Sequence, residues 1–452
     1  MKSLFKKIII IILTWEARLV LLRYKPKIVA VTGSVGKTST KDALYTALAK
    51  NFRAWKSEKS FNSEIGVPLA ILGLPNGWNN PIVWIKNILK GAYLGIFNFL
   101  LDRLGVPSEV AGQFSIFKYP EWLVLEIGAD RPGDIEQLAK WLSPDAVVIT
   151  RFGKMPVHVE FFESVEEVHK EKSFLVSALK DGGLLLLNND DADVRKLRDL
   201  KRQSRAVSFS IDYESDFQAS NLEFVYAEKN GVTAPSGITF KVNYNGNSVP
   251  MTISGALGRQ QVYPVLSALA FGESIGLNMV AMLQSFKEYQ TAPGRMRILD
   301  GVKNTIVIDD SYNASPVAVA EALRTLRELK TDGKKVAVLG DMTELGKYSV
   351  KEHEKVGREA SQSADILVTV GVRARDIAKG ALENDYDEKN IFQFDTSLEA
   401  GKPIENLLSE GDIVLVKGSQ AIRMEKVVEE IMSHPEEKEK CLVRQEPEWQ
   451  KR

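Results

Sequence analysis

The chain has 452 residues but contains only one cysteine, Cys441, and four histidines. A single cysteine excludes a disulfide framework and a cysteine metal cluster, and so few histidines argue against a multi-histidine zinc site. Lys plus Arg and Asp plus Glu are equal at 59 each, so there is no net positive charge to hold nucleic acid independently of its sequence. Hydrophobic residues make up 44% and charged residues 26%, which excludes disorder over most of the chain and a polytopic membrane protein. We therefore expect a cytoplasmic protein of several domains.

The N-terminal apolar run, Ile8–Leu13, is far shorter than the ~20 residues that cross a bilayer. Lys2, Lys6 and Lys7 precede this run, as in a signal peptide, but charged residues follow at once and there is no small-residue cleavage site. Two interpretations of residues 1–26 stay open. The segment is either a helix that packs on the next domain or an anchor at a membrane interface.

From residue 27 onward, short apolar segments alternate with amphipathic ones, which predicts an α/β fold with a parallel sheet. The strand candidates of the first series are Lys27–Val31, Trp122–Glu126, Ala146–Thr150 and Leu184–Leu187. Residues 203–253 instead alternate apolar and polar side chains, which predicts an antiparallel excursion. The strand candidates of the second series are Thr305–Ile308, Lys335–Leu339, Ile366–Val370 and Ile413–Val416.

One stretch, Ile82–Leu104, is almost entirely apolar. Several of its polar residues fall on steps of four, so a helix would show one narrow polar stripe and a wide apolar face that must be buried against something. The aromatic side chains of this stretch are Trp84, Tyr93, Phe97 and Phe99. Two interpretations again stay open: the face lies on the inner surface of the membrane, or it packs against the N-terminal segment.

The segment Thr32–Ser39 lies between the first strand and the first predicted helix, Thr38–Ala49, and has the pattern of a phosphate-binding loop. Backbone N–H groups and the helix N-terminus would face an anion there. Lys37 would reach the β- and γ-phosphates of ATP, and the Thr38 hydroxyl would bind Mg²⁺. The nucleotide-binding residues of this loop are Gly33, Ser34, Val35, Gly36, Lys37, Thr38 and Ser39.

Five further blocks follow the loop in order. They are 60–68 (SFNSEIGVP), 125–129 (LEIGA) with 132–133, 309–316 (DDSYNASP), 338–346 (VLGDMTELG), and 416–419 (VKGS) with 423–425. Together with the loop, these blocks resemble the Mur ligase family, ATP-dependent enzymes that add amino acids or peptides to cell-wall precursors. The resemblance covers roughly residues 27–432, and the last three blocks are similar to the branch that adds D-alanyl-D-alanine.

The resemblance implies a metal site. Glu126 would hold Mg²⁺ together with Thr38, and His158 would help to hold a second Mg²⁺. Lys172 matches a family lysine that is carbamylated, which converts its charge from +1 to −1 and lets it bridge the metal ions. Lys170 lies close by in the sequence and is the alternative candidate.

The resemblance also assigns residues to the nucleotide and the substrates. Gln261 would contact adenine, although Pro264 stands where the family has a side-chain amide. Arg295 would approach the phosphates, and Asp310 would contact the nucleotide. The residues expected near the substrates are Asn62, Ser63, Tyr312, Asn313 and Ser419.

The implied organisation is a central P-loop domain over 27–295, with an apolar helical insertion at about 76–120. A Rossmann-like C-terminal domain over 296–432 follows, and then a charged, mobile tail over 433–452. Family members carry an N-terminal domain that binds the UDP end of the substrate, whereas about 26 residues precede the first strand here. We therefore expect the sugar nucleotide to be held differently or by another chain, or the acceptor to differ.

The implied reaction joins D-alanyl-D-alanine to UDP-N-acetylmuramoyl-tripeptide through an acyl phosphate, with ATP and Mg²⁺. One alternative is a membrane-associated ligase of the same family that acts on another acceptor, such as a poly-amino-acid or amidating ligase. The other is a non-catalytic ATP-binding scaffold.

Overall fold

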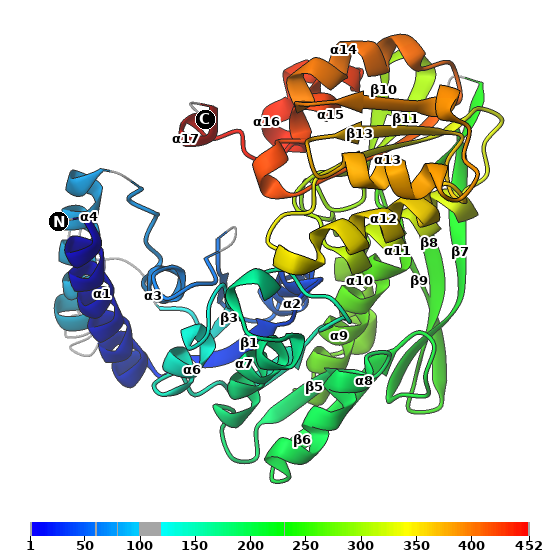
Figure 1. The fold of residues 1–452 in the computed structure, drawn as a ribbon. Helices are drawn as coiled ribbons and strands as arrows, with labels where there is room; N and C mark the ends of the chain where they lie inside the picture. The colour runs from blue at the N-terminus through cyan, green and yellow to red at the C-terminus, as the bar shows by residue number, and fades with distance from the viewer. Residues whose placement is uncertain (1, 59–60, 79, 99–118, 230, 451–452) are drawn as a thin grey trace.

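A computed structural model describes residues 2–58, 61–78, 80–98, 119–229 and 231–450 and confirms the α/β class, with two separate sheets (Figure 1). The larger sheet has nine strands in the order β2-β3-β1-β4-β5-β6-β7-β8-β9. Its strands are β1 Lys27–Thr32, β2 Ala54–Lys56, β3 Trp122–Glu126, β4 Ala146–Ile149, β5 Leu184–Asn188, β6 Arg205–Ser210, β7 Phe217–Lys229, β8 Val232–Tyr244 and β9 Asn247–Ser254.

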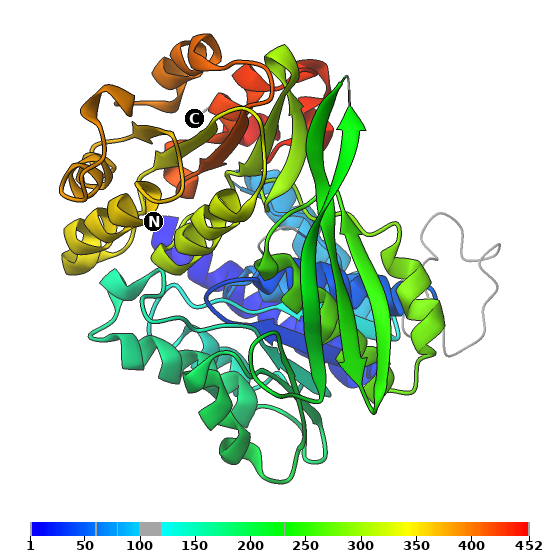
Figure 2. The same ribbon diagram turned by 90° about the vertical axis from the view of Figure 1, so that its right-hand side faces the viewer.

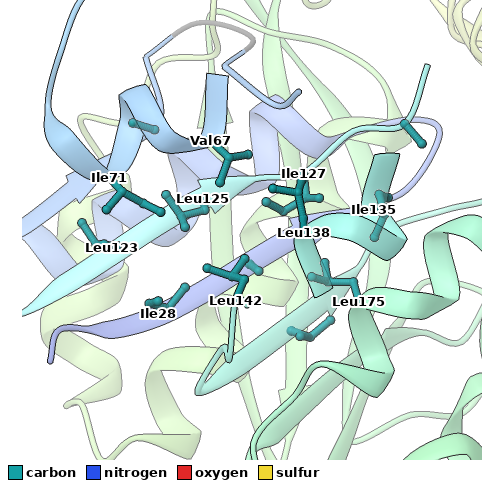
Figure 3. Packing of buried hydrophobic residues seen from close by; sticks show 14 of the residues in the cluster. Ile28, Val67, Ile71, Leu123, Leu125, Ile127, Ile135, Leu138, Leu142 and Leu175 are labelled. Carbon is teal, nitrogen blue, oxygen red and sulfur yellow. The ribbon is translucent and has the colours of Figure 1, made fainter. Parts of the chain in front are cut away.

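The strands from β2 to β6 are all parallel, and four of them, β1, β3, β4 and β5, were predicted from apolar runs. Such runs arise because both faces are covered. The helices α3 Gly66–Leu72, α6 Asp134–Ala139 and α7 Val165–Ser177 cover one face, where Leu123, Leu125 and Leu175 belong to one buried cluster (Figure 3). The helices α2 Lys37–Ala49, α9 Val262–Ser274 and α10 Met279–Phe286 pack on the other face.

The predicted antiparallel excursion begins later than expected. Strand β6 pairs with β5 in parallel, and only β7, β8 and β9 form an antiparallel ribbon. The ribbon is long and reaches the second sheet (Figure 2). There Lys229 forms an ion pair with Asp300, and the Tyr226 hydroxyl accepts a hydrogen bond of 2.9 Å from the Lys330 backbone N–H. The ribbon therefore braces the two halves of the molecule.

The second sheet has six strands in the order β10-β11-β15-β12-β13-β14, and all its pairings are parallel except β10 with β11. Its strands are β10 Arg297–Gly301, β11 Thr305–Asp310, β12 Lys335–Gly340, β13 Ile366–Val370, β14 Ile391–Phe394 and β15 Ile413–Lys417. The helices α11 Pro316–Glu328, α12 Ser349–Ala360 and α13 Arg375–Leu382 cover one face, and α14 Ser397–Leu407 and α15 Glu425–Ile431 cover the other. Helices on both faces of a largely parallel sheet give the expected Rossmann-like arrangement.

The N-terminal segment is one helix, α1 Lys2–Tyr24, which packs against α3 and against α4 Pro81–Tyr93 with its π-helical continuation Leu94–Asn98. The interpretation in which the two apolar segments pack on each other is therefore confirmed. The expected wide buried face is wrong, because Ile82, Ile85 and Leu89 of α4 are exposed. Residues 99–104, including Phe99, lie outside the described residues. Among the helices described, none combines the length and the apolar character needed to cross a membrane.

The expectation of a mobile charged tail is wrong for residues 433–450, which pack on the C-terminal sheet. Cys441 and Leu442 are buried in the core beneath α14 and α15. Arg444 is buried as well and lies 2.8 Å from Glu425 of α15. Buried apolar side chains and ion pairs, including Arg444 with Glu425 and Lys438 with Glu429, thus hold a segment whose composition alone suggests disorder.

Candidate functional site

The phosphate loop has the shape its sequence predicts. Gly33 and Gly36 have φ values of 147° and 85°, which L side chains rarely adopt. A Cβ at Gly33 would lie 2.0 Å from Oγ1 of Thr150, the residue after β4. That hydroxyl donates to the Val35 carbonyl at 2.7 Å, so the residue that follows β4 holds the loop in position. The loop then opens into α2, whose N-terminus begins at Lys37.

Lys37 extends back across this loop, and its ammonium donates to the Gly33 carbonyl at 3.0 Å. Burial lowers the pKa of Lys37, while the charge of Glu126 opposes that effect. Lys172, on α7, is also buried, and burial followed by the charge of Lys37 lowers the pKa of Lys172 to about 7. A substantial fraction of this amine is therefore uncharged and nucleophilic near neutral pH. Lys170 is exposed on the same helix.

Glu126 ends β3 and lies beside Val31 in the strand register, which brings it to the edge of the sheet that carries the loop. Its Oε1 accepts a hydrogen bond of 3.2 Å from Asn62, so one residue expected near the substrate touches the expected metal ligand. Its Oε2 is buried, lies 3.9 Å from the Lys41 ammonium, and has no hydrogen-bond partner within the described residues. A carboxylate oxygen in this condition fits a hard cation such as Mg²⁺.

His158 lies at the cleft but contacts two carboxylates. Its Nδ1 is 2.7 Å from Glu344 Oε2 in the C-terminal domain, and its Nε2 is 3.5 Å from Asp130 Oδ1. Within the described residues there is no group of three or more His, Cys, Asp and Glu side chains that could hold a metal. A role for His158 at a second metal ion stays a prediction, and the contact it makes here joins the two domains.

The C-terminal domain supplies the opposite wall of the site. Arg295 donates to the Thr38 hydroxyl at 3.4 Å, and its guanidinium lies 3.9 Å from the centre of the Tyr312 ring. The Gln261 amide donates to the Arg295 carbonyl at 3.0 Å, while its buried Oε1 lacks a hydrogen-bond partner among the described residues. Arg295, at the boundary between the two domains, therefore bridges the phosphate loop and Tyr312 of the C-terminal domain.

Asp310 and its neighbours are paired within this wall. Asp310 Oδ2 accepts a hydrogen bond of 2.6 Å from Lys417, whose ammonium also donates to the Asn313 carbonyl. Ser419 is buried behind the wall, where its hydroxyl accepts from the Thr343 backbone N–H at 2.9 Å. Ser63 accepts from the Val67 backbone through its carbonyl, at the start of α3.

One cavity of about 660 Å³ lies between the two walls. Most of the predicted residues line it, whereas Gly33, Ser63, Lys172 and Ser419 lie just outside the lining. The predicted residues that line it are Ser34, Val35, Gly36, Lys37, Thr38, Ser39, Asn62, Glu126, His158, Gln261, Arg295, Asp310, Tyr312 and Asn313.

Sequence reasoning missed two residues that line the cavity, Asp130 and Trp449, and one that lies behind it, Lys41. Lys41 is buried beside Glu126, and its spacing of four from Lys37 on one helix was an available signal. Asp130 approaches His158, and no sequence signal singles it out. Trp449 lines the cavity from the tail, where its carbonyl accepts a hydrogen bond of 2.9 Å from Arg423. It was overlooked because the tail was expected to be mobile.

Two family models match the chain: the Mur ligase middle domain over residues 95–272 and the Mur ligase glutamate ligase domain over residues 294–420. Similar proteins include the UDP-N-acetylmuramoyl-tripeptide–D-alanyl-D-alanine ligases of Bacillus subtilis and Escherichia coli, at 25% and 27% identity. The first alignment covers 90% of this chain and 76% of the relative, and the second covers 89% and 76%.

Solved structures of the same family share the fold. The MurF ligase of Thermotoga maritima in complex with ADP has a TM-score of 0.72 and 25% identity, over 93% of this chain and 83% of that one. A MurF of Acinetobacter baumannii has a TM-score of 0.71 and 22% identity, over 91% and 79%. With both domain models matched and these folds shared, the chain belongs to the Mur ligase family.

Proposed function

We propose that the protein is an ATP-dependent amide ligase that joins D-alanyl-D-alanine to UDP-N-acetylmuramoyl-tripeptide. The observation that carries the proposal is the cavity between the two sheets. It brings Lys37, Thr38 and Glu126 of the central domain, and Arg295 at the domain boundary, together with Tyr312 of the C-terminal domain. The names of the relatives and the ADP in the Thermotoga structure support the substrates and the nucleotide.

The reaction begins when the acceptor carboxylate of UDP-N-acetylmuramoyl-tripeptide is activated. Transfer of the γ-phosphoryl group of ATP to that carboxylate forms an acyl phosphate and ADP. The amine of the dipeptide then attacks the acyl carbon, the C–N bond forms, and phosphate leaves. Such transfer needs positioning and neutralisation of charge more than covalent help from the protein.

The residues of the cleft suit these needs. The loop N–H groups and Lys37 would bind the β- and γ-phosphates, and Arg295 would reach the transferring group from the opposite wall. Thr38 and Oε2 of Glu126, which has no hydrogen bond within the described residues, would hold Mg²⁺, which shields negative charge on the phosphates when bound. Burial keeps Lys172 partly uncharged, and only the neutral amine adds CO₂ to form a carbamate.

Phosphate release tests this proposal directly. The protein should release phosphate from ATP when it is given both UDP-N-acetylmuramoyl-tripeptide and D-alanyl-D-alanine. Oxygen-18 in the acceptor carboxylate should appear in the released phosphate, because the acyl phosphate oxygen leaves with it. Label in AMP instead would overturn the acyl phosphate.

The same assay separates the alternatives. A ligase for another acceptor would stay silent with this pair and release phosphate with other acids or amines. A non-catalytic scaffold would bind ATP and release no phosphate with any of them. For location we propose the cytoplasm, at the inner face of the membrane.

A further inference from the structure

Helices α1 and α4 each carry a row of exposed apolar side chains, and we call the two rows together the outer face. Their exposed fractions run from 46% to 72%. The side chains are Ile8, Ile11, Trp15 and Leu22 on α1 and Ile82, Ile85 and Leu89 on α4. Spacings of three, four and seven residues place each row on one side of its helix. This face is separate from the cleft and takes no part in the ligase chemistry.

The two rows share one side of the molecule because the helices run parallel. Gly91 faces Glu16, where a Cβ would lie 2.1 Å from the carboxylate Oε2, and Gly95 faces Leu19 further along. Beyond them the Arg23 guanidinium donates to the Ile96 carbonyl. Each helix buries its inner side against the body of the protein, so the exposed rows both point outward. Figure 1 shows α1 and α4 together at the edge of the molecule, away from the C-terminal sheet.

The exposed charges that α1 and α4 themselves carry have one sign, although Glu64 outside these helices pairs with Lys6 of α1 at 3.1 Å. Lys7 and Arg18 of α1 and Lys86 and Lys90 of α4 are exposed. Glu16 is the single acidic residue of α1 and is buried, and α4 has none. The whole chain has a formal net charge of zero, so this positive charge is a local feature. A binding partner that matches this positive charge must present an anionic surface.

We propose that the outer face lies on the surface of an anionic lipid bilayer. From Ile8 to Leu22 the α1 row extends over roughly 21 Å at about 1.5 Å per residue, so the helix would lie flat in the interface. Apolar residues on one side with Lys and Arg beside them are the pattern of helices that bind in this way. Trp15 stands in the middle of the row, and tryptophan favours the headgroup region.

A second copy of this chain is a poorer occupant. In a two-fold interface the same patch meets itself, so the basic side chains of both copies would approach each other. No exposed acid of α1 or α4 is available to pair with them. A bilayer rich in anionic headgroups supplies the missing negative charge.

Vesicle flotation of the full-length protein tests the proposal. We expect it to float with vesicles that contain phosphatidylglycerol and to float less with pure phosphatidylcholine or at high salt. The fourfold variant Ile11→Ser, Trp15→Ser, Ile85→Ser, Leu89→Ser should lower the partition coefficient about tenfold or more, since it removes apolar area from the contact. Arg18→Gln with Lys86→Gln should lower binding to anionic vesicles by about fivefold per residue.

A matched control changes equally exposed apolar residues elsewhere. Val350 and Leu398 of the C-terminal domain are 53% and 77% exposed. Val350→Ser with Leu398→Ser should float like the wild type. Every variant should keep the wild-type melting temperature, because all the changed side chains are exposed.

Three results would overturn the proposal. The intact protein could stay at the bottom of the gradient with anionic vesicles. The fourfold variant could float as well as the wild type, which would place lipid binding on another surface. In lipid-free solution the wild type could be a dimer that the fourfold variant converts to monomer, which would make the outer face a contact between copies. Flotation does not depend on ligase activity, so its outcome is independent of the proposed function.

Discussion

The two walls of the cleft differ in how their buried charged side chains are paired. On the central-domain wall, Lys37 and Lys172 are like charges buried close together, and Glu126 Oε2 lacks a hydrogen bond within the described residues. On the C-terminal wall, opposite charges already pair: Asp310 with Lys417, and Glu425 with Arg444. Residues of both walls line the same cavity, but Glu126 Oε2 has only the Lys41 ammonium at 3.9 Å, whereas the pairs of the second wall are in direct contact at 2.6 and 2.8 Å.

This difference indicates a division of labour. Buried charge without a partner costs free energy, and proteins retain it mainly where a ligand or a reaction uses it. We expect the central wall to gain stability when nucleotide and metal bind, and the C-terminal wall to hold its shape without them. Mutations in the central-domain wall should therefore mainly lower activity, and mutations in the C-terminal wall should mainly lower stability.

The largest effect should come from Lys37→Ala. Loss of the ammonium removes charge stabilisation from the phosphoryl transfer, so kcat should fall by about a thousandfold. The melting temperature should hold or rise, because one of two neighbouring like charges is gone. Steady-state phosphate release and thermal unfolding check the two parts, and a large loss of stability would contradict the contrast between the walls.

The next effect concerns Lys172 and has a control on the same helix. Lys172→Ala should lower kcat by about two orders of magnitude, and short carboxylates such as acetate should restore part of it by supplying the missing anion. Lys170→Ala removes an exposed lysine two residues away and should leave kcat unchanged. Equal activity of the two variants would show that no carbamate is needed.

Arg444→Ala probes the paired wall. It removes the 2.8 Å partner of one oxygen of the Glu425 carboxylate, whose side chain is 0% exposed, and leaves Arg423 paired with the other oxygen. The free energy of unfolding should fall by about 2 kcal/mol. Urea unfolding measures the loss, and the double variant with Glu425→Gln should recover part of it. A full loss of activity at unchanged stability would assign Arg444 to the reaction instead.

The smallest effect lies outside the cleft, at the buried contact between α1 and α4. Burial raises the pKa of Glu16 to about 7, above its usual 4.5. The folded state therefore favours the protonated carboxyl, and that contribution to stability is full below pH 4.5 and lost as pH rises through 7. Glu16→Gln should increase the free energy of unfolding by about 1–2 kcal/mol at pH 8 and by less at pH 5. Urea unfolding at both values checks this, and an equal change at the two would contradict it.

The sequence predicts those structural features that a local residue pattern specifies, and it does not predict contacts between distant segments. The phosphate loop is predictable because Gly33 and Gly36 must adopt positive φ, and β1 and β3 because strands buried on both faces are continuously apolar. The pairing of Arg444 with Glu425 leaves no local pattern, since nothing in either segment specifies the other. The sequence likewise did not show which side of α4 would be buried, because that depends on where α1 packs, and no local pattern in α4 specifies α1.

The packed tail has a consequence for how the protein is made. Cys441, Leu442 and Arg444 follow both sheets in the sequence, yet Cys441 and Leu442 complete a core of the C-terminal domain and Arg444 is buried against Glu425. A polypeptide that stops before Cys441 would retain the phosphate loop and lack these core contacts, together with Trp449 at the cavity. Premature termination should therefore yield an ATP-binding fragment that proteases degrade, and full-length synthesis becomes a condition for assembling the cleft.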